Sequence, residues 1–131
     1  MTTAFLLDTH VLLWLVSSPK RIPPATLALL HHPSNTLVVS SVVAMEMATK
    51  NRLGKMENAN PLIDNWDSVM KRLGADETPL TRKQALTAGL LDWAHRDPFD
   101  RMLAAQAINL NISLVTKDVE LHALDGLRVQ W

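Results

Sequence analysis

The stretch Phe5-Leu6-Leu7-Asp8 places an acid directly after a short, unbroken apolar run. Such a run is typical of a strand that is buried on both faces, as in a parallel sheet covered by helices. The pattern recurs near the C-terminus, where Ser113-Leu114-Val115-Thr116 leads to Asp118. Each acid therefore follows the carboxyl end of a predicted strand, which is where open α/β sheets bind their ligands.

The rest of the chain alternates between strand and helix patterns. Further strands are predicted at 36–39, more weakly at 77–80, and as an edge strand at 127–131. Apolar spacing and capping residues predict helices at 11–16, 23–30, 42–54, 61–73, 82–95 and 98–110. Strands separated by helices indicate an α/β fold with a mainly parallel sheet. Because no repeat or linker interrupts the pattern, we expect residues 1–131 to form one domain.

The composition excludes several kinds of site. The chain contains no cysteine, which excludes a disulfide scaffold, a thiol nucleophile and thiolate-bound zinc. Asp8 interrupts the N-terminal apolar run, unlike a secretory signal. The longest apolar block, 11–16, is far shorter than the ~20 residues that span a bilayer. We therefore expect a soluble, cytoplasmic protein with no membrane partner.

The charge balance is unusual for a nucleic-acid-binding protein, because such proteins are commonly basic. Thirteen basic and thirteen acidic residues cancel in this chain. If four carboxylates are committed to a metal ion, nine acids remain against the thirteen basic residues. The net charge is therefore weak evidence against a nucleic-acid substrate and does not exclude one.

Four acids are predicted to meet at one end of the sheet. Glu46 lies about one turn into the helix after the second strand, and Asp100 lies in the first turn of its helix, so both join Asp8 and Asp118 there. Converging carboxylates repel one another unless a cation or proton neutralises them. Oxygen ligands without cysteine or a helical histidine pair favour Mg²⁺ or Mn²⁺ over zinc. Such an ion can activate water against a phosphodiester.

Each acid also has a purely structural alternative. Asp8 could cap the next helix, and Asp118 could be a turn residue. The stretch Asp97-Pro98-Phe99-Asp100 predicts a helix start with Asp97 as the N-cap and Asp100 at the third helical position. We assign Asp97 to capping, while for Asp100 the helix position is compatible with metal binding. Glu46 alone would be a solvated helix residue, although its neighbours are apolar.

Four stretches of the chain resemble the PIN domain, and more narrowly the VapC-type toxins of bacterial toxin–antitoxin pairs. They span the whole chain and carry the four acids in the order of the family. The stretches are Leu6-Leu7-Asp8-Thr9-His10-Val11-Leu12-Leu13-Trp14, Ser41-Val42-Val43-Ala44-Met45-Glu46, Asp97-Pro98-Phe99-Asp100-Arg101-Met102-Leu103-Ala104-Ala105-Gln106-Ala107 and Leu114-Val115-Thr116-Lys117-Asp118.

This resemblance implies a three-layer sandwich, with a five-stranded, mainly parallel sheet and helices on both faces. It implies a carboxylate cluster that binds Mg²⁺ or Mn²⁺ and an activity that cleaves single-stranded RNA endonucleolytically. The implied partners are a second copy of the chain, in a homodimer, and a cognate antitoxin that covers the site and binds operator DNA.

The resemblance also implies individual roles in the site. The implied metal ligands and catalytic residues are Asp8, Asp100 and Asp118, with Glu46 as a further ligand that binds directly or through water. Thr116 is implied as a hydroxyl that supports the ligands. Asp97 matches a position that is often acidic in this subgroup. Charge and expected position near the acids, and not the resemblance, make Lys50, Arg52 and Arg101 candidate RNA contacts. A charged helix face is more commonly just solvated.

The remaining side chains carry weaker signals. None of the five histidines is assigned to catalysis. The helical spacing of several large apolar residues predicts core positions for Trp14, Trp66, Trp93, Met45, Met47, Met70 and Met102.

Two alternative functions remain at this stage. A phosphoacceptor receiver domain is also a small parallel α/β protein with an acidic Mg²⁺ site. It would need paired acids after the first strand and an Asp after the third, but here one acid follows the first strand and the third ends at Pro79-Leu80. The other alternative is a non-catalytic interaction module with the PIN fold.

Overall fold

The computed structural model describes residues Thr2–Trp131, and its centre is a five-stranded sheet in the order β3-β2-β1-β4-β5. All four strand pairs are parallel. The strands are β1 (Ala4–Leu7), β2 (Thr36–Ser40), β3 (Asp76–Thr78), β4 (Ser113–Val115) and β5 (Val129–Gln130). The predicted mainly parallel sheet is therefore confirmed. A receiver domain would instead show the order 2-1-3-4-5, so the strand order excludes that alternative.

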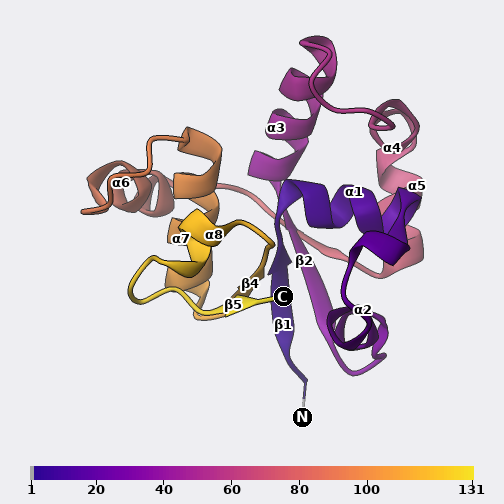
Figure 1. Ribbon diagram of the computed structural model, residues 1–131, viewed down its shortest axis with the longest axis horizontal. Coiled ribbons are helices and arrows are strands. Elements are labelled where there is room, and N and C mark those ends of the chain that lie inside the picture. The colour runs from indigo at the N-terminus through magenta and orange to yellow at the C-terminus, as the bar shows by residue number, and fades with distance from the viewer. Residues whose placement is uncertain (1) are drawn as a thin grey trace.

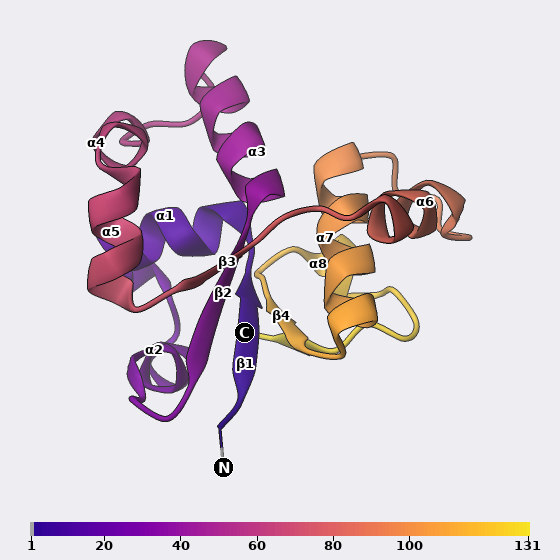
Figure 2. The same cartoon turned by 180° about the vertical axis from the view of Figure 1, so that it is seen from behind.

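Helices cover both faces of the sheet, as the three-layer prediction requires. Figures 1 and 2 show α1, α2, α4 and α5 on one face and α6, α7 and α8 on the other, while α3 rises beyond the end of β2. The helices are α1 (Thr9–Ser17), the 3-10 turn η1 (Pro19–Arg21), α2 (Pro24–His31), α3 (Ser41–Arg52), α4 (Asn60–Asp64), α5 (Trp66–Leu73), α6 (Arg82–Leu90), α7 (Pro98–Leu110) and α8 (Val119–His122). None of the helices within Thr2–Trp131 has the length and apolar character needed to cross a bilayer.

The apolar strand residues lie at the centre of the core. Leu6, Leu7 and Leu114 are completely buried between the two helical layers, which explains why these strands read as unbroken apolar runs. On α7, Leu103, Ala104 and Ala107 are equally buried. These buried strands form a rigid platform whose carboxyl ends carry the predicted acids.

The predicted core position of Met45 is wrong, because 63% of this residue is exposed. Ser41, Met45, Ala48 and Arg52 are all exposed and share one face of α3 at helical spacing. Glu46 lies on the opposite, buried face of the helix with Val42, Val43 and Met47. Of the other predicted core residues, Trp14, Met47 and Met70 are buried, and Trp66, Trp93 and Met102 are partly buried against the core.

Several helix ends follow the expected capping chemistry. The Ser40 hydroxyl caps α3 by accepting the Val42 N–H at 3.0 Å. The Asp97 carboxylate caps α7 by accepting the N–H groups of Phe99 and Asp100 at 2.9 and 3.2 Å. The predicted capping role of Asp97 is therefore confirmed, and it fixes the first turn of the helix that carries Asp100.

The predicted helix at 61–73 is divided into α4 and α5 by a break at Asn65. The side-chain amide of Asn65 donates to the Pro61 carbonyl oxygen at 2.8 Å, so a side chain replaces the backbone donor that would continue the helix. The helix does end at Gly74, as predicted, in the left-handed conformation with φ 62°.

The predicted helix at 82–95 is wrong beyond Leu90, where α6 ends. The Arg101 guanidinium, projecting from α7, accounts for this irregular segment, because it donates to three of its carbonyl oxygens and to two more in the last turn of α6. The distances are 2.9 Å to Ala88, 3.4 Å to Gly89, 2.7 Å to Leu91, 2.8 Å to Trp93 and 2.9 Å to His95. Since its donors are occupied in this way, the structure favours a structural role for Arg101 over the predicted RNA contact.

We predict that Arg101→Lys lowers the free energy of unfolding by about 2 kcal/mol or more, because an ammonium cannot reach this set of carbonyls and leaves some of them unpaired. Urea denaturation measures the change. The matched control is Arg96→Lys, at an exposed neighbouring position, which should change the stability by less than about 0.5 kcal/mol. Equal stability of the two variants would contradict the structural role of Arg101.

Candidate active site

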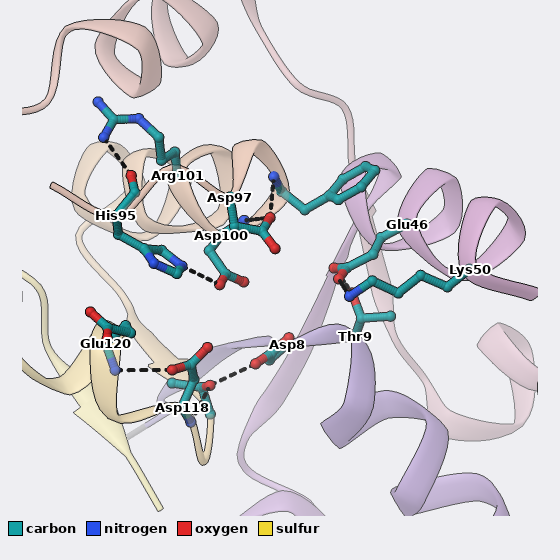
Figure 3. Close-up of polar contacts among 12 residues, drawn as sticks. Asp8, Thr9, Glu46, Lys50, His95, Asp97, Asp100, Arg101, Asp118 and Glu120 are labelled. Atoms are coloured by element: carbon teal, nitrogen blue, oxygen red, sulfur yellow. Dashed lines mark hydrogen bonds and ion pairs between the residues drawn. The ribbon is translucent and has the colours of Figure 1, made fainter. Parts of the chain in front are cut away.

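The four predicted acids line one cleft of about 470 Å³ at the carboxyl end of the sheet, together with Asp97. Figure 3 shows the carboxylates of Asp8, Asp100 and Asp118 pointing toward one another, with Glu46 to one side. The structure thus brings together residues that lie on four different segments of the chain.

Asp8 enters the cleft directly from the end of β1. Its N–H donates to the Val115 carbonyl oxygen at 3.0 Å, and its Oδ2 accepts the Thr116 hydroxyl at 2.6 Å. Asp8 occupies the N-cap position of α1, but within Thr2–Trp131 its side chain makes no capping hydrogen bond. The carboxylate is therefore directed to the cleft, and the capping alternative for Asp8 does not describe this structure.

Thr116 links the two strand ends that carry Asp8 and Asp118. Its hydroxyl is completely buried and, besides donating to Asp8, accepts the Asp118 N–H at 3.1 Å. Asp118 also caps α8, because its Oδ1 accepts the Glu120 N–H at 2.9 Å. In place of the turn position considered for Asp118, the structure gives it a helix N-cap, and its side chain also lines the cleft. Thr116 lies beside the predicted acids and hydrogen-bonds to Asp8.

Glu46 is held by donors on both of its carboxylate oxygens. The Thr9 hydroxyl donates to Oε1 at 2.5 Å, and the Lys50 ammonium forms a close ion pair with Oε2. Glu46 is only 3% exposed, which excludes the solvated alternative. With both oxygens occupied, the geometry favours contact of Glu46 with a metal through water over direct ligation.

The ammonium of Lys50 is held in the site by its ion pair with Glu46. Burial disfavours its charge, but the hydrogen bond and charge of Glu46 outweigh burial and raise the pKa of Lys50. Arg52, by contrast, lies exposed at the end of α3. Of the predicted RNA contacts, Lys50 is thus paired with Glu46, whereas Arg52 is exposed to solvent.

Burial places the aspartates under electrostatic strain. Burial raises the pKa of Asp8, the Thr116 hydrogen bond opposes this effect, and the charge of Glu46 adds to it. Burial also raises the pKa of Asp100 to about 7, against the hydrogen bond of His95 and with the charges of Asp97, Asp8 and Asp118. Buried carboxylates that repel one another are stable in the charged form only when a nearby cation balances them.

The donor set fits a divalent cation. One ligand atom from each of Asp100, Asp118 and His95 lies within 4.8 Å of the others, and the carboxylate of Asp8 faces the same space (Figure 3). Carboxylate oxygens are the preferred ligands of Mg²⁺ and Mn²⁺. Asp8, Asp100 and Asp118 could therefore hold such an ion while Thr116 and Thr9 orient the acids.

Two of these polar residues were not predicted from the sequence. Thr9 adjoins Asp8 in the first family-like stretch, but its partner Glu46 is 37 residues away in the chain. His95 was assigned to a helix that the structure ends at Leu90. Its Nε2 lies 2.7 Å from Oδ2 of Asp100, and no sequence signal indicated this pairing.

We predict that Asp8→Asn in the presence of EDTA raises the Tm at pH 8 by a few degrees, on the order of 1 kcal/mol. The pKa of Asp8 is higher in the folded than in the unfolded protein, so the folded state binds the proton more tightly. The charged group therefore costs stability at high pH, and this cost disappears as the pH falls toward the unfolded pKa of about 4.

Thermal unfolding between pH 4 and 8 measures this effect. The control is Asp92→Asn, at an exposed position, which should change the Tm little. A lower Tm for Asp8→Asn at pH 8 would show that the acid is structural.

Comparison with known proteins identifies the family of the chain. The family model described as "PIN domain" matches residues 5–127. A curated relative, Ribonuclease VapC22 of Mycobacterium tuberculosis, is 29% identical over 122 residues, which cover 92% of each chain.

Solved structures share the fold. One is VapBC2 from Rickettsia felis bound to a promoter DNA fragment, with a TM-score of 0.72, 19% identity and coverage of 98% of both chains. Another is VapBC-1 from nontypeable Haemophilus influenzae, with a TM-score of 0.69, 22% identity and coverage of 98% and 97%. A third is FitAcB from Neisseria gonorrhoeae, with a TM-score of 0.63, 20% identity and coverage of 95% of both. The PIN-like sheet and the resemblance to VapC-type proteins are thereby confirmed, and the chain belongs to the PIN domain family.

Proposed function

We propose that this protein is a metal-dependent endoribonuclease that cleaves single-stranded RNA and acts as the toxin of a toxin–antitoxin pair. The observation that carries the proposal is the convergence of Asp8, Asp100 and Asp118 in one cleft at the carboxyl end of the sheet. Membership of the PIN family and the relative named as a ribonuclease support it.

In the proposed hydrolysis, the residues of the cleft have separate roles. A Mg²⁺ or Mn²⁺ ion held by Asp8, Asp100 and Asp118 would polarise the phosphate and make water more acidic. Thr116 fixes the carboxylate of Asp8. Thr9 and Lys50 fix Glu46, which in this proposal orients the attacking water or accepts its proton.

The path of the RNA follows a second cavity of about 290 Å³, because His10 and Trp14 line both it and the acidic cleft. Arg21 and Lys55 line this second cavity. Cations at such positions bind the phosphates of a single strand. In our proposal, the sugar–phosphate backbone runs from the acids past His10 and Trp14 to Arg21 and Lys55.

Trp14 anchors two cations beside this path, Arg21 and Lys117, and does not serve as a platform for a base. Only 9% of this residue is exposed, which leaves too little surface for stacking. The Arg21 guanidinium lies 4.7 Å and the Lys117 ammonium 5.9 Å from its ring centroid. A cationic strip of this kind beside the acids explains how a chain with no net charge can hold RNA.

The proposed partners are an antitoxin and a second copy of the chain. The antitoxin is supported by the shared fold with VapBC and FitAcB structures, and the homodimer by the family resemblance. On α6, Leu86 and Leu90 are 58% and 82% exposed one turn apart, as expected of an apolar surface for association. A cytoplasmic location follows from the proposed RNA substrate.

We predict that the wild type cleaves a fluorogenic single-stranded RNA with Mg²⁺ or Mn²⁺ and not with EDTA. Asp100→Asn should lower the rate by about a hundredfold or more, because it removes a charge that holds the ion. Asp92→Asn is the matched control, and both variants are checked for folding by their Tm. Absence of cleavage by antitoxin-free wild type with either ion would reject the nuclease and favour the non-catalytic PIN module.

We predict that the double variant Arg21→Gln/Lys55→Gln weakens RNA binding and lowers its salt dependence. Each lost phosphate contact should reduce the slope of log K against log salt by about 1. Fluorescence anisotropy in the inactive Asp100→Asn background measures the affinity without cleavage. The control Arg72→Gln/Lys71→Gln, on exposed positions of α5, should leave the slope unchanged, and equal slopes for all proteins would refute the proposed path.

A further inference from the structure

Among the histidines of residues 2–131, His95 is the one grouped with two of the aspartates at ligand distance, and the proposed hydrolysis gives it no role. Within Thr2–Trp131, His95, Asp100 and Asp118 form the one group of three metal-binding side chains whose ligand atoms lie within 4.8 Å of one another. Figure 3 shows the imidazole of His95 directed at the carboxylate of Asp100, on the side opposite Glu46.

The imidazole is held in this place by contacts that do not involve the acids. Its ring packs against the Trp93 ring with the centroids 4.8 Å apart. One nitrogen of the Arg101 guanidinium, Nη1, donates to the carbonyl oxygens of both Trp93 and His95. A side chain that is fixed before a cation arrives is suited to be a ligand, because little freedom is lost on binding.

On this side of the cleft, Asp100 and Asp118 each have an oxygen left for a cation. Both oxygens of Glu46 accept hydrogen bonds. In Asp118, Oδ1 caps α8, and no donor among residues 2–131 bonds to Oδ2. In Asp100, Oδ2 faces His95, and Oδ1 is likewise without a donor in this part of the chain. These oxygens lie beside the carboxylate of Asp8, which faces the same space. Nε2 of His95 and Oδ2 of Asp100 share a proton across their hydrogen bond, and a cation bound between them would replace that proton.

We propose that His95 is a direct ligand, through a ring nitrogen, of a divalent cation that Asp100 and Asp118 also bind, and that it makes the site prefer Mn²⁺ to Mg²⁺. The inference rests on the proposed metal dependence of the nuclease. Mg²⁺ is a hard ion that binds oxygen ligands and water, whereas imidazole is a ligand for transition-metal ions. One nitrogen in place of one oxygen therefore penalises Mg²⁺ more than Mn²⁺.

Pulsed electron paramagnetic resonance of Mn²⁺ added to the metal-free wild type tests ligation directly. A bound nitrogen modulates the electron spin echo of Mn²⁺, and the modulation changes when histidine carries ¹⁵N instead of ¹⁴N. We expect this histidine signal in the wild type and in His10→Gln, which removes the histidine that lines the cleft. We expect the signal to be lost in His95→Gln. A wild type without the signal, or a signal that His10→Gln abolishes, would overturn the proposal.

Calorimetric titration with Mn²⁺ and with Mg²⁺ tests the metal preference. His95→Gln should weaken Mn²⁺ binding about tenfold or more and Mg²⁺ binding much less, so the affinity ratio falls. The control is His31→Gln, at an exposed position on α2, and the Tm of each variant verifies folding. Parallel weakening of both ions in a folded His95→Gln would mean that His95 only orients Asp100, and it would overturn direct ligation.

The two proposals can fail separately. Metal-dependent RNA cleavage by a wild type that shows no nitrogen coupling to Mn²⁺ would overturn the role of His95 and leave the nuclease intact. Absence of both Mn²⁺ binding and cleavage in the wild type would reject the nuclease and the histidine ligand together.

Discussion

The parallel pairing of β1 with β4 is the constraint on which the site depends. In this register Leu7 lies opposite Val115, so the residues that follow the two strands leave the sheet side by side. Asp8 and Thr116 thereby come within 2.6 Å although 108 positions separate them in the chain. The completely buried Leu6, Leu7, Leu114 and Val115 hold this register, because a slip of one residue would turn apolar side chains out of the core.

The fold concentrates negative charge where it also removes water. Asp8, Glu46 and Asp100 are each less than one-tenth exposed, and burial raises the pKa of Asp8 and Asp100. Glu46 is balanced by Lys50, whereas the aspartates share one small region. A divalent cation would relieve this imbalance. In the proposed metal site, the same charge repulsion would lower the stability of the metal-free protein and raise the affinity for the ion.

Much of this arrangement could be predicted because it follows from local sequence patterns. The apolar runs before Asp8 and Asp118 predicted the parallel sheet and the edge at which these acids meet, and Asp97-Pro98 predicted the start of α7. The errors arose where a distant or side-chain contact overrides the local pattern. The amide of Asn65 interrupts one helix, and Arg101 holds 91–95 in an irregular path that brings His95 to Asp100. Neither contact leaves a periodic signal in the sequence, and Met45 shows that apolar character alone does not reveal which helix face is buried.

The most direct measurement is a crystal structure of the protein soaked in Mn²⁺, with anomalous diffraction data to locate the ion. If these carboxylates form a divalent-cation site, the wild type should show an anomalous peak in the cleft, within ligand distance of Asp8, Asp100 and Asp118. Crystals of Asp100→Asn should lack this peak. A well-ordered cleft with no peak, or Mn²⁺ found only on surface acids away from it, would contradict the assignment of these carboxylates to a metal centre.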